Sequence, residues 1–430
     1  MNVSKQFAKF VSQNILGTLG VSCYIIADTF FISLMAGANG ITVLNLALPI
    51  YNFMFAIGAM IGIGSATKFS ILRAQKDARS DNYMFNSIVW LAIFSLIFVF
   101  AGLFAPDSVM RLMGADEQIV ALGIGYFRIF LLFAPFFMIN YVFTAFVRND
   151  NDPSLAMLAT VTSSLANVVF DYIFMFPMEM GLSGAALATA ASPIISILIC
   201  SLHFRKKNNT LKLIPKMPSI KRTAESAKLG VPAFIAELSS GITTMIFNFL
   251  ILGIAGNIGV AAYGVVANFA LVAIAMFNGI FQGSQPLISK YYGEGDEQAT
   301  RKVLKLGVTT ALTIAAVMYV VVFCFTDVLV DVFNSEHSVE MAAYAFDGMR
   351  LYFIGFFFAG VNIVVSGFLS ATEKVVGSFI ISILRGVAAI VFFAFILAHF
   401  FGFTGVWVSF AAAEAFTTLA AILCLTYKRK

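Results

Sequence analysis

Twelve long apolar runs, separated by short polar breaks, constrain this chain more than any other feature. A helix needs about 20 apolar residues to cross the hydrocarbon core of a bilayer, and each run is long enough. The sequence therefore predicts an all-α polytopic membrane protein with twelve transmembrane helices. The runs lie near residues 11–35, 41–67, 84–105, 119–143, 154–176, 183–203, 229–254, 258–287, 306–326, 342–368, 376–400 and 403–426.

The composition excludes the water-soluble classes. Charged residues make up 11% of the 430 residues, whereas an average soluble domain has about 25%. A soluble enzyme, a disordered chain and a nucleic-acid-binding protein are therefore not expected. The four cysteines lie in apolar runs without paired spacing, so a disulfide framework or zinc site is not expected either. No phosphate-binding loop, metal-ligand cluster or Ser/His/Asp group is present in the sequence, and we expect no enzymatic activity.

The basic residues indicate the orientation in the membrane. Cytoplasmic loops of membrane proteins carry an excess of Lys and Arg. If the N-terminus is cytoplasmic, 23 of the 27 basic residues fall on the cytoplasmic side. An even number of spans then places both termini in the cytoplasm.

Two halves of the sequence echo each other. Each half holds six predicted helices, so we expect two pseudo-symmetric bundles, residues 1–204 and 229–430, joined by a basic linker at 205–228. Parallel repeats of this kind place a substrate site at the repeat interface. The matched positions are Gly37 and Gly256 at an offset of 219, Gly64-Ser65 and Gly283-Ser284 at 219, Arg128 and Asn140 with Arg350 and Asn362 at 222, and Gly181 and Gly184 with Gly402 and Gly405 at 221.

Ionisable residues inside apolar spans are costly and usually carry ions, protons or substrates. In the first half these are Asp28 and Asp171. Tyr24 precedes Asp28 by four residues and Asn167 precedes Asp171 by four, so each pair shares a helix face. Thr189 lies at a comparable depth in the next span. This set predicts a site for Na⁺ or for a shared proton, and the alternative is that the two acids only hydrogen-bond helices together.

The second half contains Glu237, Glu414 and the base Arg385 inside its spans. An unpaired buried charge is unstable, so Arg385 is expected to pair with Glu237 or with Glu414. The other acid would then be free for substrate or proton. Gln282 and Asn362 add neutral polar groups to this predicted polar or substrate site.

The apolar interior is rich in Phe and Met, with 47 and 18 residues. Aromatic rings and soft sulfur atoms suit a plastic pocket for organic cations. We therefore expect small organic cations and the lipid bilayer as partners, and no nucleic acid. We also expect a monomer.

Several stretches resemble the multidrug and toxic compound extrusion (MATE) family, in its prokaryotic branch of DinF-like and MepA-like exporters. The resemblance covers nearly the whole chain. It is carried by ADTFFISLMAG from Ala27, ALPIYNFMFAIGAMIGIGSAT from Ala47, FVRNDNDPSLAM from Phe146, NVVFDYIF from Asn167, GLSGAALATAAS from Gly181 and GVPAFIAELSS from Gly230.

The resemblance implies an antiporter of the prokaryotic cytoplasmic membrane that exports cationic, amphipathic compounds by alternating access. Proton or Na⁺ entry would drive export, with no other cofactor. By position, Tyr24, Asp28, Asn167, Asp171 and Thr189 look like the family's cation site. Glu237 matches the acidic position of its seventh helix. Two other functions stay open, a flippase for a lipid-linked precursor and a membrane receptor without transport activity.

Overall fold

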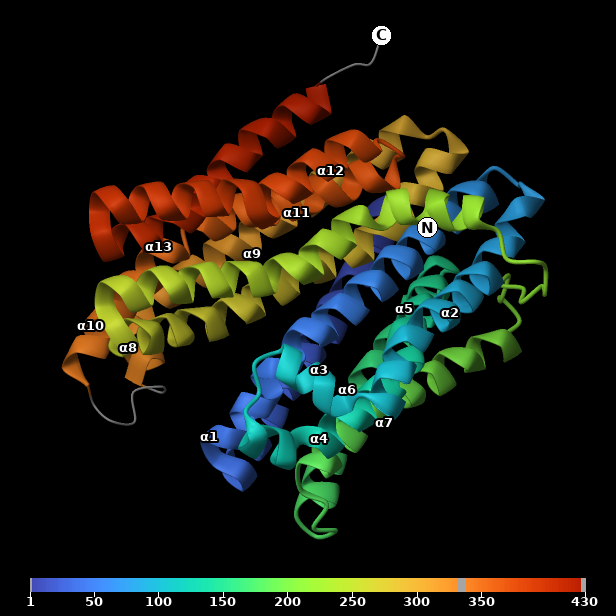
Figure 1. The fold of residues 1–430 in the computed structure, drawn as a ribbon. Helices are drawn as coiled ribbons and strands as arrows, with labels where there is room; N and C mark the ends of the chain where they lie inside the picture. Colours follow the sequence, from blue (N-terminus) through green and yellow to red (C-terminus); the bar gives the residue numbers. More distant parts are fainter. Residues whose placement is uncertain (1, 332–337, 427–430) are drawn as a thin grey trace. The chain divides into compact units, whose positions relative to one another are not determined.

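The computed structural model describes residues 2–331 and 338–426, which form helices and connecting loops without any strand. Figure 1 shows the helices along the chain. The elements of the first half are α1 (Val3–Ala74), η1 (Ala78–Asn82), α2 (Tyr83–Phe104), α3 (Pro106–Leu112), α4 (Glu117–Leu132), α5 (Ala134–Asn149), α6 (Pro153–Met175), α7 (Gly181–Ser201) and η2 (Leu202–Arg205). Those of the second half are α8 (Ile220–Glu294), α9 (Glu297–Asp331), α10 (Val339–Tyr352), α11 (Gly355–Ala371), α12 (Val375–Ile383), the π-helical turn η3 (Leu384–Ala388) and α13 (Ala389–Thr426).

The described helices agree with twelve spans. Eight helices are long and apolar enough to cross a membrane, or ten when the bent pairs α4–α5 and α10–α11 each count as one span. Two of these ten segments are long enough for two spans each. Helix α8 is broken at Gly256, and the last segment, Val375–Thr426, is broken at Gly402. The chain is a multi-pass α-helical membrane protein.

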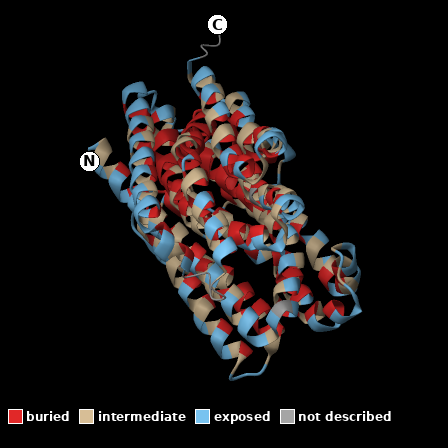
Figure 2. Cartoon of the chain, turned by 90° about the vertical axis from the view of Figure 1, so that its left-hand side faces the viewer, coloured by how far each residue is buried: buried red, intermediate tan, exposed pale blue. Residues whose placement is uncertain are grey.

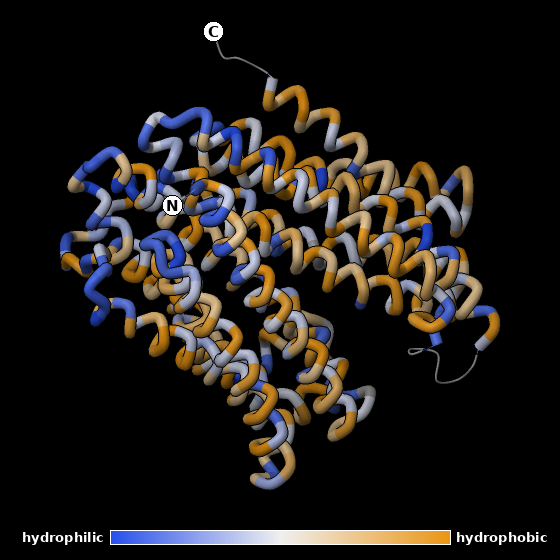
Figure 3. The backbone as a smooth tube through the Cα atoms, turned by 180° about the vertical axis from the view of Figure 1, so that it is seen from behind, coloured by the Kyte–Doolittle hydropathy of each residue, from blue (hydrophilic) through white to orange (hydrophobic). Residues whose placement is uncertain are grey.

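The outer faces of the helices are apolar, as contact with lipid requires. On α2 alone, Ile97 is 70% exposed and Phe104 is 78% exposed. Figure 2 shows the buried residues on the faces that helices turn toward one another. In Figure 3 the hydrophilic segments lie mainly at helix ends and connections, and the hydrophobic segments lie along the helices. A water-soluble fold would reverse this pattern at its surface.

Backbone conformation confirms the internal repeat. Gly37 has φ 55° and ψ −146°, and Gly256 has φ 59° and ψ −157°. Residues with a side chain rarely adopt these angles, and here they join two helices without a loop. Left-handed residues recur at the offsets found in the sequence, in the pairs Gly37 and Gly256, Lys76 and Gly295, Asn151 and Glu373, and Gly181 and Gly402.

The contacts divide the chain into two units that do not follow the chain order strictly. We call Ser12–Glu237 with Ser289–Asp296 the first unit. The second unit consists of Met1–Val11, Leu238–Ile288 and Glu297–Lys430. Helices α1 and α8 therefore each contribute to both units. The residues 206–219, which precede α8, contain no helix.

Glycines of the second helix in each repeat allow close helix crossings. In the first unit a Cβ on Gly64 would lie 1.9 Å from the Ser226 carbonyl oxygen. In the second unit a Cβ on Gly283 would lie 2.7 Å from Val11 Cα. Since Gly64 and Gly283 are matched positions of the repeat, both copies place a glycine at a close helix crossing.

Candidate functional site

The aspartates predicted as an ion site lie in the first unit. Asp28, on α1, is 7% exposed, and Asp171, on α6, is fully buried. Asn167 lies one turn before Asp171 and is fully buried as well. Helices α6 and α7 form a hairpin with small residues at its contact, where a Cβ on Gly184 would lie 2.8 Å from the backbone of α6. This close approach brings Thr189 of α7 next to Asn167.

The Asn167 side chain links the two helices of this hairpin. Its amide is satisfied when the nitrogen donates to Asp171 Oδ2 at 3.2 Å and the oxygen accepts from the Thr189 backbone N–H at 3.2 Å. This orientation of the amide is the one that the hydrogen-bond network selects. Asp171 Oδ2 therefore accepts a hydrogen bond from Asn167 on its own helix, and Thr189 of α7 in turn fixes the amide of Asn167.

One oxygen of each aspartate has no partner among the described residues. Asp28 Oδ1 and Asp171 Oδ1 are buried and make no hydrogen bond within the described residues. The two carboxyl groups are close enough for the charge of Asp28 to act on Asp171. A buried carboxylate without a partner is costly, so this geometry favours uptake of a proton or a small cation.

Tyr24 connects this pair with a third acid. The tyrosine is half-buried on α1 and interacts electrostatically with Asp28, Asp171 and Glu237. Glu237, on α8, belongs to the first unit. The structure therefore brings together five predicted residues, Tyr24, Asp28, Asn167, Asp171 and Thr189, and adds Glu237 to them.

Sequence reasoning missed the partner of Glu237. The Tyr141 hydroxyl of α5 donates to Glu237 Oε1 at 3.1 Å. Tyr141 packs over α1, where a Cβ on Gly62 would lie 2.8 Å from its carbonyl carbon. The available signal was the polar pair Asn140-Tyr141 inside an apolar span.

The second unit holds a different polar cluster. Arg385 pairs with Glu414, at 3.1 Å from Nη2 to Oε1, which decides between the two predicted partners. Asn362 Nδ2 donates to Glu414 Oε2 at 2.7 Å, and Thr418 Oγ1 donates to Asn362 Oδ1 at 3.0 Å. Gln282 lies half-buried on α8 in the same unit.

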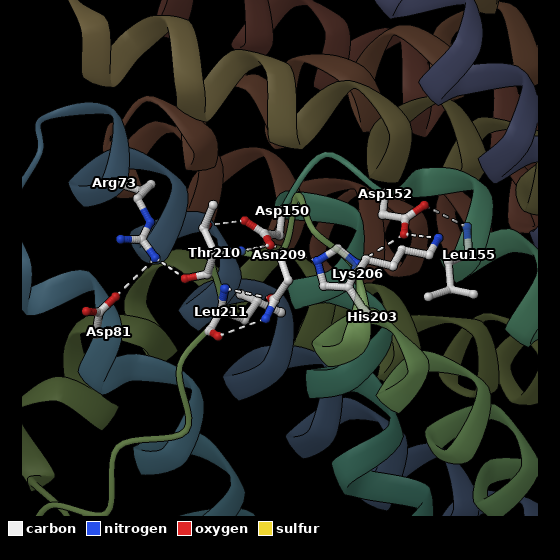
Figure 4. Close-up of polar contacts among 10 residues, drawn as sticks. All are labelled: Arg73, Asp81, Asp150, Asp152, Leu155, His203, Lys206, Asn209, Thr210 and Leu211. Carbon is white, nitrogen blue, oxygen red and sulfur yellow. Dashed lines mark hydrogen bonds and ion pairs between the residues drawn. The ribbon is translucent and has the colours of Figure 1, made fainter.

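A further set of charged and polar residues lies where α7 ends and the non-helical linker begins (Figure 4). We call Asp150, Asp152, His203, Lys206 and Thr210 the loop network. His203 is fully buried, with Nε2 at 2.7 Å from Asp150 Oδ2 and Nδ1 at 3.0 Å from Asp152 Oδ2. The Thr210 backbone N–H donates to Asp150 Oδ2 at 2.7 Å. The network ties the linker to the loop before α6, which sequence reasoning did not predict.

Asp152 contacts two basic side chains of the loop network, His203 and Lys206. Lys206 Nζ lies 2.6 Å from Asp152 Oδ2. Burial acts to raise the pKa of Asp152, but the hydrogen bonds from Lys206 and His203 outweigh it and hold the pKa below its ordinary value. Asp152 is therefore ionised in the folded protein at neutral pH.

A family model described as MatE matches residues 14–173 and residues 232–396, well over half of the chain. The chain belongs to the MatE family. The two matched stretches begin at corresponding places in the two halves, in agreement with the repeat. They include Asp28, Asp171 and Arg385 but not Thr189 or Glu414.

Curated relatives of this MatE chain span almost its full length. It is 28% identical over 426 residues to the multidrug export protein MepA of Staphylococcus saprophyticus, covering 98% of this chain and 93% of the relative. It is also 28% identical over 425 residues to MepA of Staphylococcus aureus, with the same coverage. The predicted resemblance to the MATE family and its MepA-like members is confirmed.

Solved structures confirm the MATE fold. A multidrug resistance MATE family transporter of the MOP superfamily, in an outward-facing conformation, gives a TM-score of 0.88 at 23% identity, covering 98% of this chain and 94% of that one. A MOP superfamily transporter from Pyrococcus furiosus gives 0.90 at 22% identity, covering 98% and 95%. The predicted twelve-helix architecture therefore holds.

Proposed function

We propose that this chain is a secondary multidrug exporter that exchanges organic cations for H⁺ or Na⁺. One observation carries the proposal. Asp28 and Asp171 are both buried and interact electrostatically, each with an oxygen that has no partner among the described residues, in a chain related over 98% of its length to multidrug export proteins. Inside a membrane, such acids usually serve ions or protons.

The coupling site consists of the two aspartates, supported by Asn167, Thr189 and Tyr24. An incoming proton neutralises one carboxylate. A Na⁺ ion would instead use the carboxylate oxygens with the amide and hydroxyl oxygens of Asn167 and Thr189, the hard ligands that hard cations take. H⁺ and Na⁺ are thus alternatives for the same oxygens, and no other cofactor is needed.

Ion and substrate must favour different conformational states for export to be driven. A ligand shifts an equilibrium only by its differential affinity for the two states. We infer that the ion-bound first unit favours the state with low substrate affinity, and that the chain works as a monomer. Its location would be the cytoplasmic membrane, with both termini in the cytoplasm.

The charge of the polar sites supports a cationic substrate. Arg385 is already paired with Glu414, so it offers little free positive charge to the pyrophosphate of a lipid-linked precursor. Asp28, Asp171 and Glu237, by contrast, have no ion-pair partner within the described residues. These groups attract cations and repel a pyrophosphate.

Proteoliposome uptake of a fluorescent organic cation tests this function. A pH jump and a Na⁺ jump are applied in separate experiments. We expect the wild type to accumulate the probe after at least one of them. We expect D28N and D171N to lower ion-driven accumulation by about 5–150-fold, the range of typical coupling free energies. Asp327→Asn, the same change at an exposed position on α9, is the matched control. Full accumulation by both variants, or none by the wild type under either gradient, contradicts the proposal.

A further inference from the structure

The buried acid of the second unit comes with its own cation. The Glu414 side chain is 2% exposed and that of Arg385 is 15% exposed. One guanidinium nitrogen, Nη2, lies 3.1 Å from Glu414 Oε1, while Arg385 Nε has no partner among the described residues. The two side chains therefore form one charge-assisted hydrogen bond, and the ion pair is not bidentate.

The second oxygen of Glu414 is also satisfied. Asn362 Nδ2 donates to Oε2 at 2.7 Å and also to the Glu414 backbone carbonyl at 2.9 Å. The amide is fixed in this orientation because a backbone carbonyl can only accept a hydrogen bond, so the nitrogen of Asn362 must face it. The Thr418 hydroxyl lies 3.0 Å from Asn362 Oδ1 and 2.9 Å from the Glu414 carbonyl oxygen, and its one proton can go to either. A guanidinium and an amide nitrogen are donors only, so both oxygens of Glu414 act as acceptors. This is the hydrogen-bonding pattern of an ionised carboxylate.

Local structure presents Arg385 to this acid. The arginine lies in the π-helical turn η3, a rare conformation that often marks functional positions. The preceding helix α12 is fastened to α11 by serines, with Ser378 Oγ donating to the Ser366 carbonyl at 2.7 Å and Ser366 Oγ at 2.9 Å from Ser382 Oγ. The backbone is thus fixed at Ser382, about one helical turn before Arg385.

Two phenols belong to the surroundings of this pair. Tyr352, on α10, interacts electrostatically with both Glu414 and Arg385, and Tyr263, on α8, interacts with Tyr352. The positive charge of Arg385 balances the negative charge of Glu414 within the pair. By the offsets of the internal repeat, Arg385 corresponds to positions 163–166 on α6, just before Asn167 of the first unit.

We infer that Arg385 is a tethered counter-cation, which neutralises the buried acid of the second unit as a coupling ion would neutralise the acids of the first. Ion coupling then uses one unit, and Arg385 sets the number of ions exchanged per substrate. The inference rests on the proposed function and deepens it. It assigns to Arg385 and its π-helical turn a role in the stoichiometry of transport.

The ion-to-substrate ratio, measured from the ion flux and the substrate flux in the same proteoliposomes, tests the inference. The double variant R385M/E414Q removes both charges together and is expected to keep the wild-type ratio. R385M alone leaves Glu414 without its cation and is expected to raise the ratio by one ion. R385K keeps a single positive charge and a single bond, so the wild-type ratio is expected. A lower ratio in the double variant, or an unchanged ratio in R385M, overturns the inference.

Infrared spectroscopy of the purified protein gives a readout that does not need transport. A carboxylate band of the wild type at neutral pH that E414Q removes supports the tethered pair, as does a protonated carboxyl band in R385M that is absent from R385M/E414Q. A protonated band in the wild type that E414Q removes overturns it. If the wild type transports nothing under either gradient, the proposed function fails, and the infrared result still decides the state of the pair.

Discussion

Both units bury acids, at different positions of the repeat, and they treat the charge differently. In the first unit, Asp28 and Asp171 each keep an oxygen without a partner among the described residues. In the second unit, Arg385 and Asn362 occupy both oxygens of Glu414. A duplicated fold has therefore kept the helices and changed the electrostatics. The difference assigns ion exchange to one copy and a permanent ion pair to the other.

The loop before the fifth helix of each repeat shows a second difference. Asn151 and Glu373 share a left-handed conformation at matched positions of the repeat. In the first repeat Asp150 and Asp152 flank this position and bind His203. In the second repeat Thr372 and Lys374 flank it, so the two carboxylates that hold the histidine have no counterparts. Both halves therefore have the left-handed turn, but the two aspartates that bind a histidine belong to the first half alone among the described residues.

The largest effect is expected from neutralising the buried acids one at a time. E414Q leaves Arg385 buried without its ion-pair partner and should lower the free energy of unfolding by about 3 kcal/mol. D171N removes a carboxylate that has no counter-charge, so a change within about 1 kcal/mol is expected. Unfolding of the purified variants in detergent by a denaturant measures both. Equal losses in the two variants would remove the contrast between the units.

The glycine crossings allow a second comparison. Gly64→Ala places a Cβ 1.9 Å from a carbonyl oxygen, whereas Gly283→Ala places one 2.7 Å from the nearest backbone atom. Overpacking typically costs about 1–3 kcal/mol, so we expect about 3 kcal/mol for G64A and about 1 kcal/mol for G283A. Thermal unfolding of both variants shows which of them loses more stability. A more damaging G283A would show that the first crossing is the more adaptable one.

Acid sensitivity should reside in the loop network. The folded-state pKa of Asp152 lies below its ordinary value, so its contribution to stability is present at neutral pH and is lost as the pH falls through that lowered value. A typical intramolecular hydrogen bond contributes about 1 kcal/mol, and we expect a contribution of this size from Asp152. Unfolding measured between pH 7 and pH 3 should show a shallower loss in D152N than in the wild type, with D327N as the control. Parallel curves for D152N and the wild type would contradict the assignment.

The smallest effect concerns the shared left-handed turn. Glu373 has φ 59° and Asn151 has φ 63°, and Asn tolerates this region better than Glu does. Glu373→Gly should therefore stabilise the protein by about 0.5 kcal/mol, whereas Asn151→Gly should have almost no effect. Thermal unfolding of the two variants tests this. Destabilisation by E373G would show that the Glu373 side chain contributes more than its strain costs.

Sequence reasoning succeeded where the signal was local. Apolar runs predicted the spans, and offsets between glycines such as Gly37 and Gly256 predicted the repeat, because both depend on short patterns that can be read directly along the chain. Acids inside apolar spans stood out for the same reason. The sequence left open whether Arg385 pairs with Glu237 or Glu414, since the answer depends on how helices pack.

Partners far apart in the chain were the part that escaped prediction. Tyr141 and Glu237 are separated by 96 residues, and Thr210 and Asp150 by 60. No periodicity links such residues, and the linker around Thr210 has the composition of an ordinary basic loop. Its fold depends on buried carboxylates that only the assembled helices bring near it.

The most direct test of the central claim compares two matched double variants in proteoliposomes. D28N/D171N removes the acids of the first unit, and R385M/E414Q removes the ion pair of the second. We expect D28N/D171N to lose ion-driven accumulation of a fluorescent cation while it still exchanges substrate across the membrane without a gradient. R385M/E414Q should still accumulate the cation under the ion gradient. Accumulation that persists in D28N/D171N and disappears in R385M/E414Q would contradict the account.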